Sequence, residues 1–347
     1  MYRKKLILLI SLIGLFVGLI FVIRFYQIFF WSNTNFENDF AYIFIDRDDT
    51  IDSLNIKLKP IIKSNNFFLT AAEKKGYFKS IIPGKYKIKK RMGNNQIINI
   101  LRSQKLTTKV VFNNQQRLED LAGRIAAQIE PDSLELLNSF LDSSFLSKTG
   151  FSKENAMAMY LPNTYDVFWD TTPEDFRTRM LNYYNKFWNK IRLKKAKALN
   201  LSPIEVYILA SIVQKESVKK DEQSRIAGVY INRLKRKIKL QADPTIIFAL
   251  KLNSGDFNKV IKRVLYEDLR LKSEYNTYLK LGLPPGPIIM PDISTIDSVL
   301  NPEQHNFLYF VASPQKPGYH LFAENLKDHN VNKQYYIKWL DSKKLFR

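Results

Sequence analysis

The chain has 347 residues, of which 54 are Lys or Arg and 33 are Asp or Glu, so its formal net charge is +21. Apolar residues make up 45% and aromatic residues 13%, which is enough for hydrophobic cores and excludes a wholly disordered chain. Cysteine is absent, which excludes a disulfide framework, a thiolate zinc site and a cysteine nucleophile. The length indicates two domains, or three small ones.

An apolar run near the N-terminus predicts a membrane anchor. Residues 6–23 carry no charge, and a helix of this length spans about 27 Å, close to the ~30 Å hydrocarbon core of a bilayer. Residues 3–5 are all basic, whereas only Arg24 follows the run closely, which indicates a cytoplasmic N-terminus. We therefore predict a single pass through the cytoplasmic (inner) membrane, with the catalytic part in the periplasm. A cleaved signal peptide is the alternative, but no small-residue cleavage site follows the run.

Positive charge also characterises the exported part. Without the four basic residues at 3–5 and 24, the chain still carries +17. Such a surplus favours anionic partners, including lipid headgroups and acidic wall polymers. We expect no nucleic-acid partner, because the charges form no dense stripe with a recognisable binding motif. Solvated faces of lysine-rich helices account for most of them.

The first elements after the anchor predict a small α/β module. In chain order we expect a strand over 40–45, helices over 51–63 and 70–75 separated by Asn65-Asn66, a strand–turn–strand unit over 81–88, and a short helix from 94 through 101. A strand over 109–113 and a helix over 118–129 follow. Residues 131–200 are expected to be rich in helix, with an interruption at 161–165.

The most informative helix starts at residues 202–205, where Ser-Pro-Ile-Glu supplies a cap, a first-turn proline and a capping-box glutamate. Leu209, Ile212 and Val213 define its buried stripe, and Glu216 follows at i+7 in line with them. A carboxyl in that place is partly desolvated, so its pKa is raised, as a general acid near neutral pH requires. The alternative for Glu216 is a salt bridge to Arg233.

Polar residues after this helix are candidates for binding a ligand. A second helix over 221–237 carries Asn232 on its flank, and Glu222 near its start is expected to cap it. Asp243 before Pro244 is either a helix N-cap or a second carboxylate. The run 275–278, Tyr-Asn-Thr-Tyr, offers rings, an amide and a hydroxyl suited to sugars, or is an ordinary turn.

A hairpin is predicted from 306–312 and 319–322. Strand alternation places His320 and Phe322 on one of its faces. His320 is expected to orient the catalytic carboxyl, to contact substrate, or to be a structural histidine. His329 is expected to precede the last helix.

Seven motifs occur in order along the chain: ILASIVQKES, INRL, LQADPT, YNTY, GLPPGPI, FLYFVA and GYHLFAENLKDHN. Together they resemble the endolytic murein transglycosylases, the YceG-like proteins, over essentially the whole length. The resemblance places the family's essential glutamate at Glu216, because Gln214 stands where the family often has an acid. The family's Pro-Asp-Thr-Tyr is Pro-Asn-Thr-Tyr at 162–165, so a cleft-shaping role is expected there.

The resemblance implies an α+β fold: an N-terminal transmembrane helix, a small LysM-like α/β module and a larger mixed α/β catalytic region with a helical catalytic core. We expect an anchor over 1–31, the LysM-like module over 38–108, a helix-rich middle region over 109–200 and the catalytic region over 201–347.

The implied reaction is lytic cleavage of the MurNAc–GlcNAc β-1,4 bonds of nascent glycan strands, with 1,6-anhydro-MurNAc formation. Glu216 serves as acid and then base, and no metal or organic cofactor is expected. The expected partners are peptidoglycan strands, the membrane and peptidoglycan polymerases. The expected substrate-binding residues are Asn232, Gln241, Asp243, Tyr275, Asn276, Thr277 and His320. The alternatives are a muramidase-type hydrolase that uses Glu216 and Asp243 with water, and a non-catalytic wall-binding scaffold.

Overall fold

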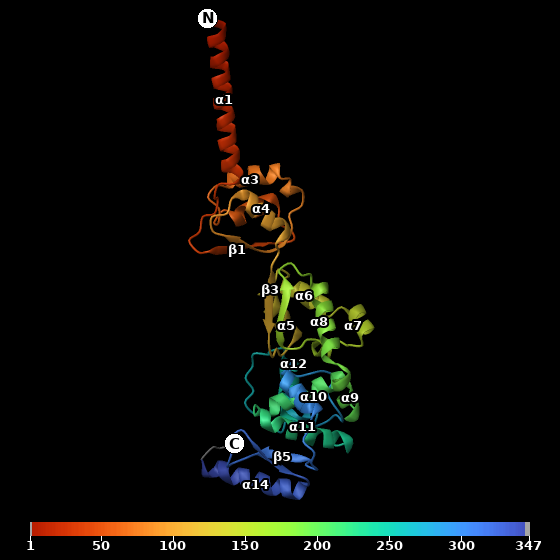
Figure 1. The fold of residues 1–347 in the computed structure, drawn as a ribbon. Coiled ribbons are helices and arrows are strands. Elements are labelled where there is room, and N and C mark those ends of the chain that lie inside the picture. Colours follow the sequence, from red (N-terminus) through yellow and green to blue (C-terminus); the bar gives the residue numbers. More distant parts are fainter. Residues whose placement is uncertain (1, 344–347) are drawn as a thin grey trace. The chain divides into compact units, whose positions relative to one another are not determined.

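The computed structural model describes residues 2–343 and has a mixed α/β fold (Figure 1). The chain divides into two compact units. Unit 1 comprises residues 1–110, 126–131 and 165–172, and unit 2 comprises 111–125, 132–164 and 173–347. Strands β3 (Thr107–Phe112) and β4 (Asn163–Phe168) pair with each other, and each belongs partly to both units. The predicted division into four segments remains a prediction.

Unit 1 begins with a helix of spanning length. Helix α1 (Tyr2–Phe29) buries none of its residues, and its 28 residues have a mean hydropathy of 3.2 over their most apolar window. At about 1.5 Å per residue the helix is about 42 Å long. Length and composition are therefore consistent with a single-pass membrane anchor, as the sequence predicts.

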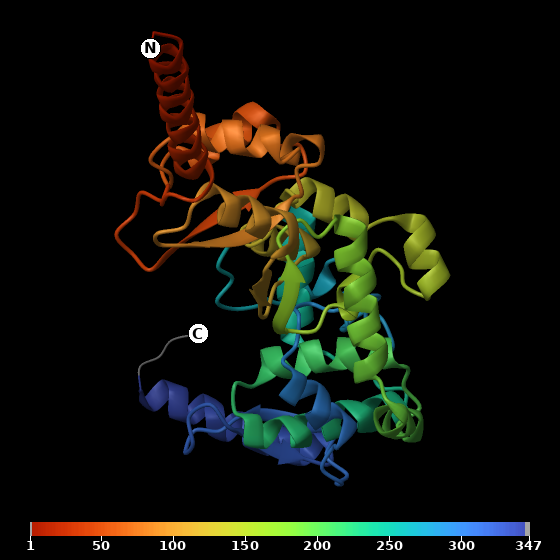
Figure 2. The same cartoon turned by 45° about the horizontal axis from the view of Figure 1, so that its top comes forward.

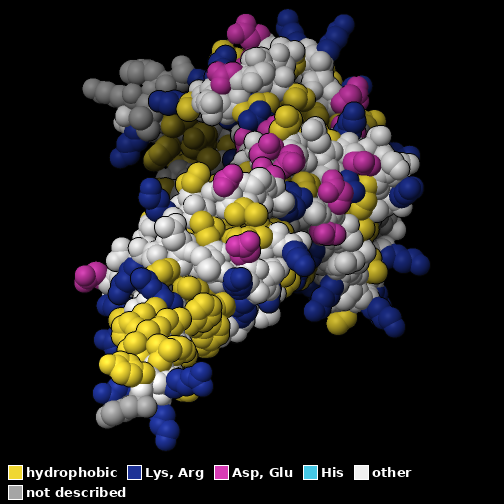
Figure 3. Space-filling view, turned by 90° about the horizontal axis from the view of Figure 1, so that it is seen from above, with side chains coloured by type: hydrophobic (Ala, Val, Ile, Leu, Met, Phe, Trp, Pro, Cys, Tyr) yellow, Lys and Arg dark blue, Asp and Glu magenta, His cyan; other side chains and the backbone are white. Residues whose placement is uncertain are grey.

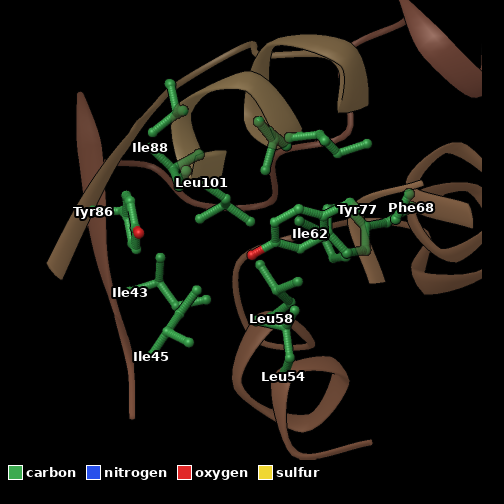
Figure 4. Packing of buried hydrophobic residues seen from close by; sticks show 14 of the residues in the cluster. Ile43, Ile45, Leu54, Leu58, Ile62, Phe68, Tyr77, Tyr86, Ile88 and Leu101 are labelled. Atoms are coloured by element: carbon green, nitrogen blue, oxygen red, sulfur yellow. The ribbon is translucent and has the colours of Figure 1, made fainter. Parts of the chain in front are cut away.

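A two-stranded sheet and three helices complete the folded part of unit 1. Strand β1 (Phe40–Ile45) pairs antiparallel with β2 (Gly84–Lys89), with Ile43 opposite Tyr86. The other elements are α2 (Ile51–Leu58), α3 (Asn65–Lys74), a 3₁₀ turn (Tyr77–Lys79) and α4 (Asn94–Ser103). Alternate residues of the strands point toward the helices and form the core that Figure 4 shows, in which Leu54, Leu58, Phe68 and Leu101 meet Ile43, Ile45, Tyr86 and Ile88.

Unit 2 is organised around a buried helix, α10 (Pro203–Glu216), in which residues 206–213 are all buried. Helices α11 (Lys220–Lys235), α12 (Asp243–Ser254) and α13 (Ile293–Leu300) contact it. The Ser211 hydroxyl accepts a hydrogen bond from the Ile288 amide at 3.1 Å, which holds the proline-rich segment against α10. The middle of the helix is thus enclosed, and its last residue, Glu216, lies beyond the fully buried part and is itself partly buried.

The remaining helices of unit 2 are α5 (Leu118–Ala126), α6 (Ser133–Phe140), α7 (Ser143–Thr149), α8 (Pro173–Phe187), α9 (Lys190–Ala198) and α14 (Leu326–Ser342), with 3₁₀ turns at Ala156–Met159 and Asp268–Arg270. Strands β5 (Tyr309–Ala312) and β6 (His320–Ala323) form the predicted antiparallel hairpin. Helix α14 packs along this hairpin, as Figures 1 and 2 both show.

The structure corrects several predicted elements. Asn65 and Asn66 do not separate two helices but begin α3, because the Ser64 hydroxyl caps this helix by accepting from the Phe67 amide. Of the predicted strand–turn–strand unit over 81–88 only β2 forms, since only this part has a partner strand. His329 lies inside α14 and does not precede it, because Asn325 caps that helix.

Candidate active site

The proposed acid lies at the C-terminal end of α10. The predicted capping box is present at the other end, where Ser202 Oγ accepts from the Glu205 amide and Glu205 Oε2 accepts from the Ser202 amide at 2.7 Å. Glu216 is the last residue of the helix, and Ser217 follows in an extended conformation. The C-terminal end of a helix carries partial negative charge, which disfavours a carboxylate there.

The Glu216 side chain is partly buried and has one close polar partner. The hydroxyl of Tyr230 on α11 donates to Glu216 Oε1 at 2.6 Å, and Tyr230 itself is only 1% exposed. Burial raises the pKa of Glu216 to about 7; the Tyr230 hydrogen bond opposes this, the nearby Asp243 charge adds to it and Arg233 lowers it. Glu216 can therefore hold a proton or release it near neutral pH, which a group acting first as acid and then as base requires.

Arg233, the alternative salt-bridge partner of Glu216, uses its guanidinium elsewhere. Its Nε donates to the Leu308 carbonyl at 2.6 Å, and its Nη1 donates to the Leu240 carbonyl at 2.8 Å. The side chain is 8% exposed and lies against the ring of Tyr309. Arg233 therefore joins the loop after α11 to the start of β5, and it influences Glu216 through its charge.

The neutral residue two before the glutamate has a structural role. Gln214 Oε1 accepts from the backbone amide of Asp292 at 2.6 Å and lies 3.1 Å from Thr295 Oγ1. These contacts hold the first turn of α13 against α10. Gln214 thus supplies no second acid beside Glu216.

Asp243 faces the same region but does not cap its helix. It is the first residue of α12, and the N-cap position is Ala242, so the predicted cap is wrong. Tyr278 donates its hydroxyl to Asp243 Oδ1. Burial raises the pKa of Tyr278, and the charges of Asp243 and Glu216 raise it further. Asp243 is exposed and therefore accessible to a ligand.

Gln241 is exposed and has an uncommon backbone conformation. Its φ is +52°, in the left-handed region that glycine or asparagine usually occupies. Its amide donates to the Thr277 carbonyl at 3.1 Å, and its Oε1 lies 3.4 Å from Arg233 Nη1. Functional sites often contain a residue with strained backbone, and Gln241 lies two residues before Asp243.

Two residues of the 275–278 turn serve the fold. Asn276 is fully buried, and its amide donates to the carbonyls of Leu269 and Leu271. Thr277 is 1% exposed, and its hydroxyl accepts from the Ala242 amide. Both side chains are buried in the fold, and contact of Asn276 and Thr277 with substrate remains a prediction. Their physical role is to hold the turn that carries Tyr278 against the start of α12.

Asn232 and Tyr275 have contacts with residues other than Glu216. The Asn232 amide donates to the carbonyls of His305 and Phe307, at 2.8 and 3.1 Å, so it fixes the segment before β5. Tyr275 is buried against Phe248 and lines a cavity of about 380 Å³. Contact of these two residues with substrate remains a prediction.

His320 pairs with Glu222. The two oxygens of Glu222 lie 2.9 Å from the His320 amide nitrogen and 2.7 Å from its Nδ1. Glu222 is 3% exposed and holds the hairpin to α11, so the predicted cap is corrected to a partner of His320. The ring of Phe310 contacts both the His320 ring and the Tyr230 ring, with centroids 5.1 and 5.9 Å away. His320 is thus connected through Phe310 to the tyrosine that donates to Glu216.

Sequence reasoning missed the role of Tyr230. Tyr230 and Tyr278 both donate to carboxylates, but only Tyr278 lies in a segment that the sequence analysis names as a candidate for binding. The signal that could have found it is chemical, because a buried tyrosine hydroxyl usually has a hydrogen-bond partner.

The fold and the site define a mixed α/β protein with an apolar N-terminal helix and a partly buried glutamate at the end of a helix whose middle is buried. The chain belongs to the YceG-like family, whose model matches residues 43–335.

Relatives with known names agree with this assignment. The chain is 30% identical over 306 residues to an endolytic murein transglycosylase of Bacillus subtilis (strain 168), covering 81% of this chain and 80% of the relative. It is 34% identical over 172 residues to one of Streptococcus pneumoniae (strain ATCC BAA-255 / R6), covering 49% of this chain and 30% of that protein. The crystal structure of a YceG-like protein from Listeria monocytogenes shares the fold, with a TM-score of 0.54 and 24% identity, over 85% of this chain and 99% of that one.

Proposed function

We propose that this chain is a membrane-anchored endolytic murein transglycosylase that cleaves the MurNAc–GlcNAc β-1,4 bonds of peptidoglycan strands. The family and the names of its relatives support the reaction class. The observation that carries the assignment of residues is the Glu216 carboxyl, with its pKa raised to about 7 and one oxygen held by Tyr230.

The hydrogen bond from Tyr230 distinguishes the two carboxyl oxygens of Glu216. Because the tyrosine donates to Oε1, the acidic proton is best held on Oε2, which becomes the oxygen that faces the glycan. Glu216 then protonates the departing glycosidic oxygen. The resulting carboxylate accepts the proton of the 6-hydroxyl of MurNAc, while that oxygen closes on C1 to form the 1,6-anhydro ring.

A single carboxylate suffices for this route, because the nucleophile belongs to the substrate. Ordinary glycosidases need a second carboxylate to activate water or to attack C1 themselves. The 6-hydroxyl of MurNAc belongs to the same sugar as C1, so its proximity to C1 replaces part of the assistance that a second carboxylate gives. Asp243, exposed and held by Tyr278, is then a substrate-contacting group together with Gln241. Because the charge of Asp243 raises the pKa of Glu216, a hydrolase that uses both carboxylates is the second candidate function.

Three further expectations belong to this proposal. Helix α1 anchors the chain in the cytoplasmic membrane with its N-terminus inside, so that the catalytic unit works on nascent strands in the periplasm. The folded part of unit 1 is the LysM-like module. Peptidoglycan polymerases are the partners that would supply new strands beside the anchor.

The test is digestion of isolated sacculi by wild type and Glu216→Gln, with product masses measured. We expect wild type to release anhydro-sugar ends and the variant to lose activity by at least about 10²-fold while remaining folded. Glu205→Gln, at the other end of α10, is the matched control and should keep activity. Products heavier by one water would establish the hydrolase instead. Anhydro products from Glu216→Gln would reject the assignment of the acid.

A further inference from the structure

The C-terminal end of α1 is attached to unit 1 by specific contacts. Asn94 at the start of α4 donates its side-chain amide to the Ile28 carbonyl at 2.7 Å and accepts from Asn33 Nδ2 at the same distance. Gly93 approaches the backbone so closely that a Cβ there would lie 2.6 Å from the Phe30 carbonyl oxygen. The surface of unit 1 beside α1 therefore has a fixed position relative to the helix.

The sequence of α1 sets the depth of this surface in the bilayer. If the apolar run 6–23 fills the hydrocarbon core, as the proposed anchor requires, Arg24 lies at its edge. The remaining turn and a half of α1 then passes through the headgroup layer, about 8 Å further. Tyr26 and Trp31 are residue types that prefer this layer. Whatever adjoins the end of α1 is therefore at headgroup depth.

A cavity of about 450 Å³ lies between α1 and α3 at this depth. Its lining is largely apolar, with two cations at its rim, and consists of Phe21, Arg24, Phe25, Ile28, Phe29, Thr70 and Lys74. Phe21 comes from the deeper turn, whereas Arg24 and Lys74 are exposed. Figure 3 shows the hydrophobic side chains of α1 gathered into one mass that Lys and Arg side chains border.

We propose that this cavity binds an anionic glycerophospholipid of the bilayer. Its phosphate lies between Arg24 and Lys74, and the upper part of one acyl chain lies along Phe21 and Phe25. Arginine binds phosphate oxygens through two parallel N–H donors, and lysine adds a point charge. The order of the groups matches a phospholipid, with rings toward the hydrocarbon and cations toward the headgroups. A lipid is the occupant because the bilayer surrounds α1 on all sides that unit 1 leaves open.

The experiment uses the full chain in nanodiscs that contain equal amounts of phosphatidylglycerol and phosphatidylcholine. Native mass spectrometry counts the lipids that remain bound when the protein is released. We expect wild type to retain phosphatidylglycerol preferentially, by roughly fivefold for each cation. The double variant Arg24→Gln/Lys74→Gln should lose this preference.

The matched control is Lys63→Gln/Lys79→Gln, which removes two exposed lysines of unit 1 on either side of α3. It has the same net charge as the test variant and should retain the wild-type preference. If both variants lose the preference for phosphatidylglycerol equally, the preference results from general surface charge and the proposed site is wrong. Equal retention of both lipids by wild type would also overturn it.

A further arm identifies the source of the phosphate. Undecaprenyl pyrophosphate, the lipid carrier of glycan strands, is added to the same nanodiscs. If it displaces phosphatidylglycerol at a low mole fraction, the cavity binds the lipid carrier and the assignment to a bilayer lipid fails. Because no arm measures glycan cleavage, failure of the lipid site is distinguishable from failure of the proposed reaction.

Discussion

The hydroxyl of Tyr230 donates to Glu216 Oε1 across 2.6 Å, joining the last residue of α10 to the middle of α11. Burial and this hydrogen bond have opposite effects on the pKa of the carboxyl. Burial raises the pKa of Glu216 because a charge is poorly solvated there, whereas the tyrosine stabilises the charge and lowers the pKa. A pKa of about 7 results from this balance.

Tyr230→Phe is expected to change the pH dependence of glycan cleavage. The acid must be protonated to act, so kcat/KM should fall in wild type as pH rises through about 7. Without the hydroxyl the pKa of Glu216 rises, and this alkaline limb moves to higher pH. The rate at the optimum should fall by about 10- to 100-fold, because a hydrogen bond to a charged group contributes about 1.5–3 kcal/mol. Initial rates on purified glycan between about pH 5 and 9 provide the measurement.

Tyr184→Phe is the control for this change. Tyr184 is also a buried tyrosine of unit 2, with its pKa raised by burial, but it packs against Trp188 and Phe151. Its substitution should leave the limb in place. If the alkaline limb stays at the same pH in Tyr230→Phe, the tyrosine does not influence the pKa of Glu216.

The stability of the fold should depend on pH through Glu216. Its pKa is higher in the folded protein than the ordinary value of 4.5, so between these values the folded protein holds a proton that the unfolded chain has released. Stability is therefore lost as pH rises from about 5 to about 8. Glu216→Gln lacks this loss and should become more stable than wild type by about 2 kcal/mol at the upper pH, allowing for partial exposure. Thermal unfolding of both proteins across this range is the measurement, and parallel curves would contradict the raised pKa.

Much of unit 1 and the location of the acid follow from local sequence patterns. Strand β1 forms over the predicted 40–45, because alternation and flanking turn residues are local signals. Glu216 is in line with the predicted buried stripe of α10, because helical spacing alone determines which residues share one face of a helix.

Other features depend on contacts between distant segments. The Tyr230–Glu216 bond and the Glu222–His320 pair join residues 14 and 98 positions apart, so their geometry depends on how α11 packs against α10 and the hairpin. The turn at 275–278 has a composition suited to sugars, but tertiary packing buries Asn276 completely. Residue type therefore indicates candidate chemistry, whereas accessibility is decided by the fold.

Gln241→Gly tests the strained residue beside the site. Glycine adopts positive φ without a side-chain clash, so the variant should be more stable by about 1 kcal/mol. If the amide contacts glycan, kcat/KM should nevertheless fall by about tenfold. Lys237→Gly is the matched control, since Lys237 lies in the same loop with φ +54° and is exposed. It should gain stability and keep full activity. Full activity in Gln241→Gly would remove Gln241 from the substrate-contacting residues.

Glu222→Ala is expected to destabilise the β5–β6 hairpin. The substitution leaves the His320 amide and Nδ1 without the carboxylate that both contact, in surroundings where Glu222 is 3% exposed. Loss of one partner from a buried pair costs about 3 kcal/mol. Asp221→Ala removes the neighbouring exposed carboxylate, which accepts from the Tyr319 hydroxyl at 3.0 Å, and should cost less than about 1 kcal/mol. Denaturant midpoints compare the two, and equal midpoints would show that the buried pair contributes no more than the exposed contact.

Gly93→Ala should loosen the attachment of α1 to unit 1. The added Cβ would lie 2.6 Å from the Phe30 carbonyl oxygen and 3.0 Å from that of Phe29, and backbone atoms cannot move aside as a flexible side chain can. Overpacking of this kind costs about 1–3 kcal/mol, so amide exchange over residues 28–35 should accelerate about tenfold in the full chain in nanodiscs. Gly123→Ala, inside α5 with open space around it, should leave that exchange unchanged and stabilise its helix by about 0.5–1 kcal/mol. Wild-type exchange in Gly93→Ala would mean that α1 is joined loosely, and the cavity between α1 and α3 would then lose the fixed geometry that lipid binding needs.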